Sequence, residues 1–199
     1  QMICDLNEGY AIYRPRYILP DYNVYIKKGC EFLELPAPKN LDEALDGLLI
    51  LYSHVPSITT FPVYIGRLDM LLDPFITDEK QDYIKIKRFL NHVDKTVPDS
   101  FCHANIGPYD TKAGRLILKA VIELEAPTPN MTIRYDKSKT SREFAELAAK
   151  ACLLVSKPSF ANDAYYISDL GEQYGIASCY NALPECGGAY TLTRLRLGT

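Results

Sequence analysis

The sequence predicts an α/β fold, and three neighbouring segments of its C-terminal half carry this prediction. Residues 110–125 place apolar side chains at the spacing of one helical face, and residues 140–155 do the same. Between them, residues 129–135 have the composition of a short strand flanked by turn residues. A strand between two amphipathic helices is typical of α/β organisation.

Two further helices are expected in the N-terminal half. One begins at Asn40, where Glu43 follows three positions later and completes a capping box, and Pro56 is expected to stop it. A more highly charged helix is expected over residues 79–97. The connection over residues 56–74 is interpreted as irregular.

The remaining C-terminal signals are more local. The helix over residues 140–155 opens with a capping box that starts at Thr140. The tail over residues 190–197 has strand character, and its apolar alternation slips by one residue, which predicts a β-bulge. No repeat or flexible linker divides the chain, so residues 1–199 are treated as a single piece.

Composition limits the classes of protein that fit. The chain has 199 residues, 47% of them hydrophobic and 24% charged, with a net charge of -3 and no long Lys or Arg run. A folded domain with a sizeable core is expected, and a nucleic-acid partner is not. No apolar run is long enough to span a membrane and no leader precedes the chain, which predicts a cytoplasmic protein. Because the first residue is Gln1, we expect a piece of a longer chain.

The six cysteines are sparse and irregularly spaced, so we expect reduced thiols rather than a disulfide framework. The three histidines lie far apart in sequence, and no spacing typical of a metal site occurs. Cys179 differs from the other cysteines. It lies on a turn rich in small residues, which predicts a displayed thiol.

Four short blocks lead up to this thiol, and the last of them ends at Cys179. They are residues 127–133 (P-T-P-N-M-T-I), residues 144–145 (F-A), residues 158–163 (P-S-F-A-N-D) and residues 174–179 (Y-G-I-A-S-C). Their order and separation resemble the catalytic core of glycyl radical enzymes, the pyruvate formate-lyase superfamily. Residues 19–22, 54–59 and 101–108 extend the resemblance to an uncharacterised branch of that superfamily.

The resemblance implies a ten-stranded α/β barrel built from two five-stranded halves, of which this chain would supply a half-barrel with its surrounding helices. Cys179 matches the family's finger-loop cysteine, so it is expected to form a thiyl radical that abstracts hydrogen from a small organic substrate. The implied cofactor is a glycyl radical, installed anaerobically by a radical S-adenosylmethionine activase that carries an iron-sulfur cluster. A homodimer of the parent protein is left open.

The chain departs from the family pattern at three places. Ser178 stands where pyruvate formate-lyase has a second cysteine, and Asn181 stands where eliminases and decarboxylases place a glutamate base. Nothing matches the R-V-x-G glycine loop, so we expect these residues to lack the glycyl radical domain and the isolated fragment to be inactive. The candidate pocket or acid-base residues are His103, Asn105, Asp163, Ser178, Asn181 and Glu185.

Two other functions fit the residues. A cysteine hydrolase or transferase would use Cys179 as nucleophile and His103 as base, with Asn105 orienting the imidazole. A non-catalytic binding fragment would need no radical site. A depressed pKa of the Cys179 thiol and a contact with His103 would favour the hydrolase.

Overall fold

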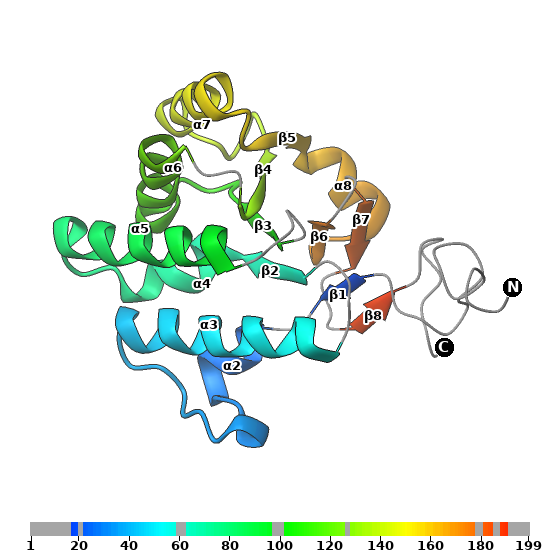
Figure 1. The fold of residues 1–199 in the computed structure, drawn as a ribbon. Helices are drawn as coiled ribbons and strands as arrows, with labels where there is room; N and C mark the ends of the chain where they lie inside the picture. The colour runs from blue at the N-terminus through cyan, green and yellow to red at the C-terminus, as the bar shows by residue number, and fades with distance from the viewer. Residues whose placement is uncertain are drawn as a thin grey trace, which may run out of the picture.

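The protein is described by a computed structural model, which covers residues 17–19, 22–58, 63–96, 102–125, 128–177, 181–184 and 188–190. Within them, side chains are described for residues 22–54, 64–96, 102–125, 128–176 and 182. The prediction of an α/β fold is confirmed, because a parallel sheet is flanked by helices (Figure 1).

The main sheet has the spatial order β5-β4-β3-β2-β1-β8. Its parallel strands are β1 (Tyr17–Leu19), β2 (Val63–Arg67), β3 (Cys102–Ile106), β4 (Asn130–Tyr135) and β5 (Ser159–Asn162). Each lies beside its neighbour in sequence, and helices connect them, as parallel pairing requires. At the β1 edge, β8 (Gly188–Tyr190) pairs in the antiparallel direction.

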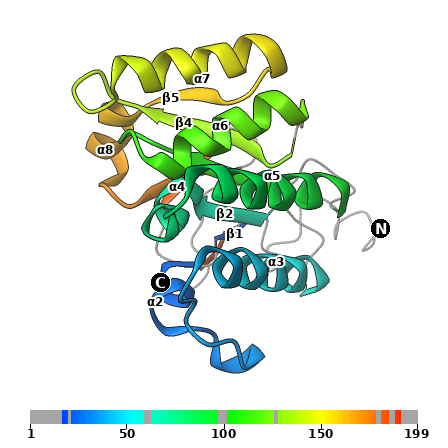
Figure 2. The same cartoon turned by 90° about the vertical axis from the view of Figure 1, so that its left-hand side faces the viewer.

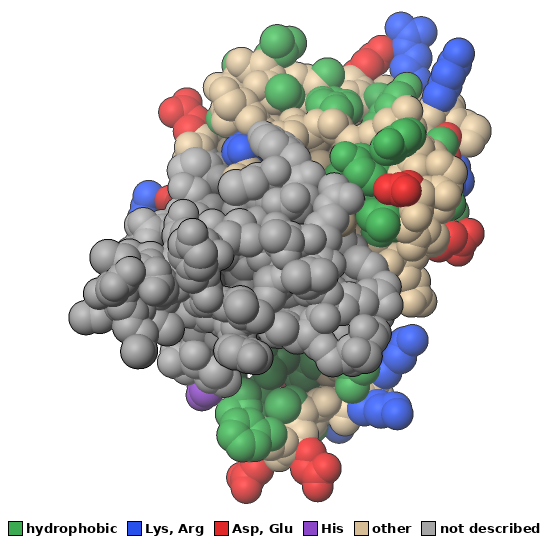
Figure 3. Space-filling model, turned by 90° about the vertical axis from the view of Figure 1, so that its right-hand side faces the viewer, with side chains coloured by type: hydrophobic (Ala, Val, Ile, Leu, Met, Phe, Trp, Pro, Cys, Tyr) green, Lys and Arg blue, Asp and Glu red, His purple; other side chains and the backbone are tan. Residues whose placement is uncertain are grey.

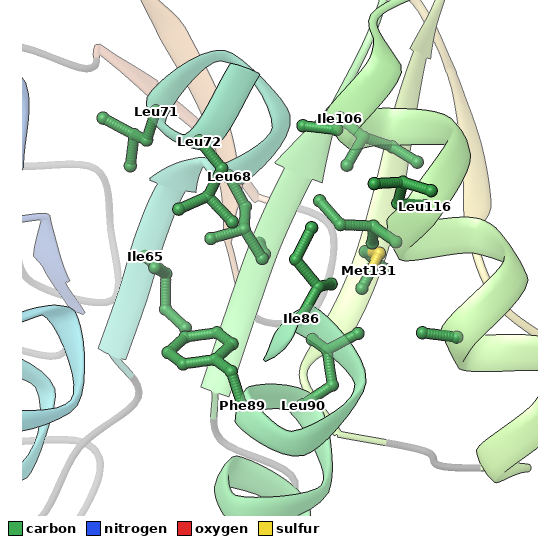
Figure 4. Close-up of a cluster of buried hydrophobic side chains, with 14 of the residues drawn as sticks. Ile65, Leu68, Leu71, Leu72, Ile86, Phe89, Leu90, Ile106, Leu116 and Met131 are labelled. Atoms are coloured by element: carbon green, nitrogen blue, oxygen red, sulfur yellow. The ribbon is translucent and has the colours of Figure 1, made fainter. Parts of the chain in front are cut away.

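One face of the sheet is covered by a helical layer (Figure 2). The helices with buried side chains in its core are α2 (Tyr22–Lys28), α3 (Leu41–Ile58), α4 (Leu68–Leu72), α5 (Glu79–Thr96), α6 (Lys112–Leu124) and α7 (Arg142–Val155). Short 3-10 turns, η1 (Glu31–Leu33) and η2 (Asp73–Phe75), precede α3 and α5. Figure 4 shows how Ile65 on β2, Phe89 on α5 and Met131 on β4 pack in this core.

On the other side of the sheet lie α8 (Asp163–Leu170) and a hairpin of β6 (Tyr174–Ala177) and β7 (Asn181–Pro184) (Figure 1). Ala161 of β5 packs with Tyr174, Ile176 and Ala182 in a small separate core. The hairpin is thus supported by the sheet face that the helical layer leaves open. No helix in the described ranges combines the length and the apolar character needed to cross a bilayer.

Local helix signals predicted most boundaries well. The helix start at Asn40 is confirmed, since Asn40 Oδ1 accepts from Glu43 N at 2.9 Å. The Glu43 carboxylate accepts from Asn40 Nδ2 and from Lys39 N, both at 2.8 Å, rather than from Asn40 N as in a standard capping box. Helices α5, α6 and α7 lie where periodicity predicts them, and strand β4 lies where composition predicts it. The described cysteines, Cys30, Cys102 and Cys152, are free thiols.

Three expectations need correction. Helix α3 continues through Pro56 to Ile58, so this proline does not end it. The N-cap of α7 is Ser141 rather than Thr140, because Ser141 Oγ accepts from Phe144 N, whereas Thr140 Oγ1 accepts from Asp136 N and closes the preceding turn. The supposedly irregular connection 56–74 contains β2 and α4. Of the strand expected over residues 190–197, the structure describes only Tyr190, so the predicted β-bulge lies outside the described residues.

Candidate functional site

The strands β2, β3 and β4 present different chemistry on their two faces. Their helix-side residues are apolar: Ile65, Cys102, Ala104, Ile106, Met131 and Ile133. The opposite side, which we call the inner face, carries Tyr64, His103, Asn105, Thr132 and Arg134, all buried. Parallel sheets are ordinarily apolar on both faces, so a buried polar face needs specific partners.

Asn105 attaches β6 to the inner face. Its Oδ1 accepts from Ile176 N at 2.8 Å, and its Nδ2 donates to Ile176 O at 2.9 Å. Tyr64 Oη donates to the same Oδ1 at 3.1 Å. The side-chain amide therefore pairs with the backbone of Ile176 as a neighbouring strand would, and the pattern fixes the orientation of the amide.

Gly175 lets β6 approach the sheet closely. A Cβ added at this residue would lie 2.5 Å from Tyr64 Cζ and 2.6 Å from its hydroxyl oxygen. Only glycine leaves room for the aromatic ring at this distance. Tyr64 thus holds Asn105 with its hydroxyl group and supports β6 with its ring.

Arg134 forms a second attachment between the sheet and β6. Its Nε donates to Asp163 Oδ1 at 2.7 Å, Nη1 donates to Tyr174 O at 3.1 Å, and Nη2 donates to Glu172 O at 3.2 Å. The guanidinium carbon lies 3.9 Å from the centre of the Tyr174 ring. Because the side chains of Arg134 and Asp163 are only 2% and 0% exposed, this is a buried ion pair satisfied by further hydrogen bonds.

Asp163, predicted as an acid or base, lies at the first position of α8. Besides Arg134, it accepts from Tyr174 Oη at 2.7 Å, and Lys139 Nζ lies 3.5 Å from its Oδ2. Both carboxylate oxygens therefore already have donors. In this arrangement Asp163 anchors β4, β6 and α8 to one another, and its role as an acid or base stays a prediction.

His103 carries a buried polar atom on the inner face for which the described residues provide no hydrogen-bond partner. Its side chain is nearly enclosed, with 6% of the residue exposed, and within the described residues Nε2 is buried without a hydrogen bond. Burial, with a smaller contribution from the charge of Lys157, lowers the pKa of His103 to about 4. The imidazole is therefore neutral near pH 7 and can exchange one hydrogen bond with a bound molecule.

A second buried carboxylate, Asp69, holds the loop that follows β3. Its Oδ2 accepts from Gly107 N at 2.8 Å and from Thr111 Oγ1 at 3.3 Å, and its Oδ1 accepts from Met70 N at 2.8 Å. Burial nevertheless raises the pKa of Asp69 to about 6. Its hydrogen bonds fix the end of β3, which carries His103 and Asn105.

The structure describes only some of the loop residues of the predicted site. Cys179 and Ser178 belong to the segment that joins β6 to β7, and Glu185 follows β7; all three lie outside the described residues. Asn181 begins β7 and pairs with Ala177, and its side chain is not described. The structure thus brings His103, Asn105 and Asp163 to the side of the sheet that supports this hairpin.

The hydrolase arrangement receives no support from the described residues. Asn105 is bonded to Ile176 and Tyr64, and no hydrogen bond joins it to His103. Cys102 points to the helix-side core, where burial raises the pKa of its thiol to about 12. Among the described residues, no group of three or more His, Cys, Asp or Glu side chains is placed to hold a metal.

Sequence reasoning missed Tyr64, Arg134, Tyr174 and the close approach at Gly175. The available signal was Arg134, a charged residue that alternates with Met131 and Ile133 inside a predicted strand. A charge at such a position requires a buried partner. The identity of the partner is not visible in the sequence, because Asp163 is 29 residues away.

Comparison with known proteins gives the family. The family model "Glycyl radical enzyme YjjI-like" matches residues 1–199. The chain belongs to this family. The expected resemblance to glycyl radical enzymes is confirmed over the whole chain, beyond the blocks around Cys179.

Two relatives support the assignment. An "Uncharacterized protein" of Haemophilus influenzae is 93% identical over 199 residues, and the "Uncharacterized protein YjjI" of Escherichia coli is 48% identical over 199 residues. These matches cover 100% and 98% of this chain. The chain spans 39% of the length of each relative, which is consistent with a fragment of a larger protein.

Proposed function

We propose that the chain forms one half of the catalytic barrel of a glycyl radical enzyme and that Cys179 is its hydrogen-atom relay. The family match over residues 1–199 is the observation that carries this proposal. The parallel strands β1 to β5 and the hairpin on their inner face support it, because Cys179 belongs to the segment between β6 and β7.

The open edge of the sheet supports the half-barrel. Among the described residues, β5 pairs with β4 alone. Phe160 on β5 and Tyr165 on α8 are exposed large hydrophobic residues, and Figure 3 shows hydrophobic side chains gathered on this side of the molecule. A second set of strands would cover such an edge and remove a liability to aggregation.

In the proposed reaction, Cys179 gives the hydrogen atom of its thiol to a glycyl radical located outside these 199 residues. The sulfur radical then takes a hydrogen atom from a small organic substrate, which restores the S–H bond and leaves the unpaired electron on the substrate. After the substrate has rearranged or fragmented, the thiol returns a hydrogen atom to the product radical. Each hydrogen transfer breaks one X–H bond and forms another, and the sulfur radical that the last transfer leaves would regain the hydrogen atom that the thiol first gave up.

The residues of this chain would serve two purposes. The buried inner face would exclude water from the sulfur radical and hold substrate at reacting distance. Neutral His103 would exchange a hydrogen bond with a hydroxyl or carbonyl group of the substrate. Asn181, Ser178 and Glu185 flank the relay in sequence and are proposed as further pocket residues, with Glu185 the candidate base.

The test is radical formation on the full-length protein. The protein is incubated anaerobically with S-adenosylmethionine, a chemical reductant and a radical S-adenosylmethionine activase from the organism that supplies the protein, and electron paramagnetic resonance is recorded. A glycyl radical doublet that needs both the activase and S-adenosylmethionine is expected. No signal from this protein, under conditions in which the activase cleaves S-adenosylmethionine, would contradict the proposal.

A further inference from the structure

The hairpin is attached to the main sheet through side chains rather than through a strand ladder. β6 and β7 form a two-stranded sheet of their own. At Ile176, both backbone hydrogen-bonding groups are satisfied by the amide of Asn105, at 2.8 and 2.9 Å. At this residue, the amide of Asn105 takes the place that a neighbouring strand would have.

A second attachment lies at the other end of the strand. Arg134 binds the carbonyl oxygens of Glu172 and Tyr174, and it is itself held by Asp163. Two attachments, at the beginning of β6 and at Ile176, fix both the position and the direction of the strand. Cys179 follows Ile176 by only three residues.

We propose that Asn105 and Arg134 are positioning residues that clamp β6 to the inner face and thereby set the position of Cys179. The inference rests on the proposed function of Cys179, and it adds the residues through which the rest of the fold acts on that thiol. Misplacing a reacting group by about 1 Å can cost about 100-fold in rate, so a clamp that fixes β6 would favour hydrogen-atom transfer by Cys179.

The first experiment compares Asn105→Ala with Asn40→Ala in the full-length protein. Both changes remove an asparagine side chain that bonds to backbone groups, but Asn40 caps α3 and lies away from the hairpin. Hydrogen exchange of the Ile176 amide is expected to become about tenfold faster in Asn105→Ala only. The alkylation rate of Cys179, followed by peptide mass spectrometry, is expected to change with it, while that of Cys152 on α7 does not.

The second experiment uses Asn105→Asp, which keeps the shape of the side chain. When ionised, this side chain can accept from Ile176 N but cannot donate to Ile176 O. When protonated, it regains a donor and reproduces the amide pattern. Protection of the Ile176 amide, corrected for the intrinsic pH dependence of exchange, should therefore recover as the pH falls in Asn105→Asp, and not in Asn105→Ala.

Two results would overturn the inference. One is equal exchange of the Ile176 amide in Asn105→Ala and Asn40→Ala, which would mean that Asn105 does not hold β6. The other is a loosened β6 with an unchanged alkylation rate of Cys179. Failure of the proposed function is distinguishable, because it appears as the absence of a glycyl radical, whereas both readouts of the clamp are obtained without the radical.

Discussion

Replacing Arg134 with Met tests the buried ion pair on which β6 depends. The substitution keeps an unbranched side chain but removes the charge and the donors that face Asp163, Tyr174 O and Glu172 O. Breaking a buried pair by removing one partner costs about 3 to 5 kcal/mol, because the remaining charge is left uncompensated. Tyr174 Oη and Lys139 still contact Asp163, so we expect the lower end of this range.

The chain offers a matched control for burial. Arg142 Nε donates to Glu146 Oε1 at 2.7 Å, the same distance as in the pair of Arg134 with Asp163, but the two side chains are 87% and 63% exposed. Arg142→Met should therefore cost far less unfolding free energy than Arg134→Met, because solvent screens the exposed pair. The free energy of unfolding is measured for both variants by urea denaturation at pH 7, from midpoint shifts at unchanged slope.

A double variant separates the pair from general damage. Asp163→Asn removes the negative charge that Arg134→Met leaves without its partner. The two changes together should therefore cost at least about 1 kcal/mol less than the sum of the single costs. Additive costs would refute a direct interaction. A loss in Arg134→Met as small as that in Arg142→Met would refute the decisive role of burial.

Three further outcomes follow from the same residues. Gly175→Ala places a Cβ 2.5 Å from Tyr64 Cζ, so it should cost about 1 to 3 kcal/mol of unfolding free energy. Adding Tyr64→Leu to the same chain should recover part of this loss. If the double variant recovered nothing, the clash would be contradicted. His103 has a folded pKa of about 4, so its contribution is present above about pH 6.5 and is lost as the pH falls through about 4. His103→Gln should remove a decline of about 3 kcal/mol from the stability curve over this interval, and an unchanged slope would contradict the burial of a neutral imidazole. Asp69 acts in the opposite sense. With a folded pKa of about 6, its contribution to stability is present below about pH 4 and is lost as the pH rises through about 6. Asp69→Asn should therefore gain stability relative to the wild type over that interval, and a stability difference that stays constant with pH would contradict this.

Helices were predictable because their signals are local. Asn40 and Glu43 lie within one turn, and the apolar face of α6 is contained in residues 112–124. The short parallel strands were harder to recognise. β3 alternates apolar residues with His103 and Asn105, so the segment resembled a polar pocket motif. Its parallel partners β2 and β4 are remote in sequence. Strands of this kind are defined by pairing more than by composition.

The residues of the candidate site could be predicted from the sequence, but their hydrogen-bond partners could not. His103, Asn105 and Asp163 were all candidates, and the fold places the first two on the inner face and bonds the third to Arg134 on that face. The partner of Asn105 is Ile176, 71 residues away, and the bond is to its backbone. Residue types alone carry no record of such a partner. The structure adds the bonds of Asn105 to β6, and its place in a pocket stays a prediction.

The most direct test of the relay compares the activated full-length protein with its Cys179→Ala variant in an anaerobic extract of small metabolites. Cys152→Ala is the control for loss of a cysteine on a helix. All three proteins should show the glycyl radical doublet, and the wild type and Cys152→Ala should consume the same metabolite, identified by mass spectrometry. We predict no consumption by Cys179→Ala at an undiminished radical signal. Consumption of that metabolite by Cys179→Ala at the wild-type rate would contradict the assignment of Cys179 as the hydrogen-atom relay.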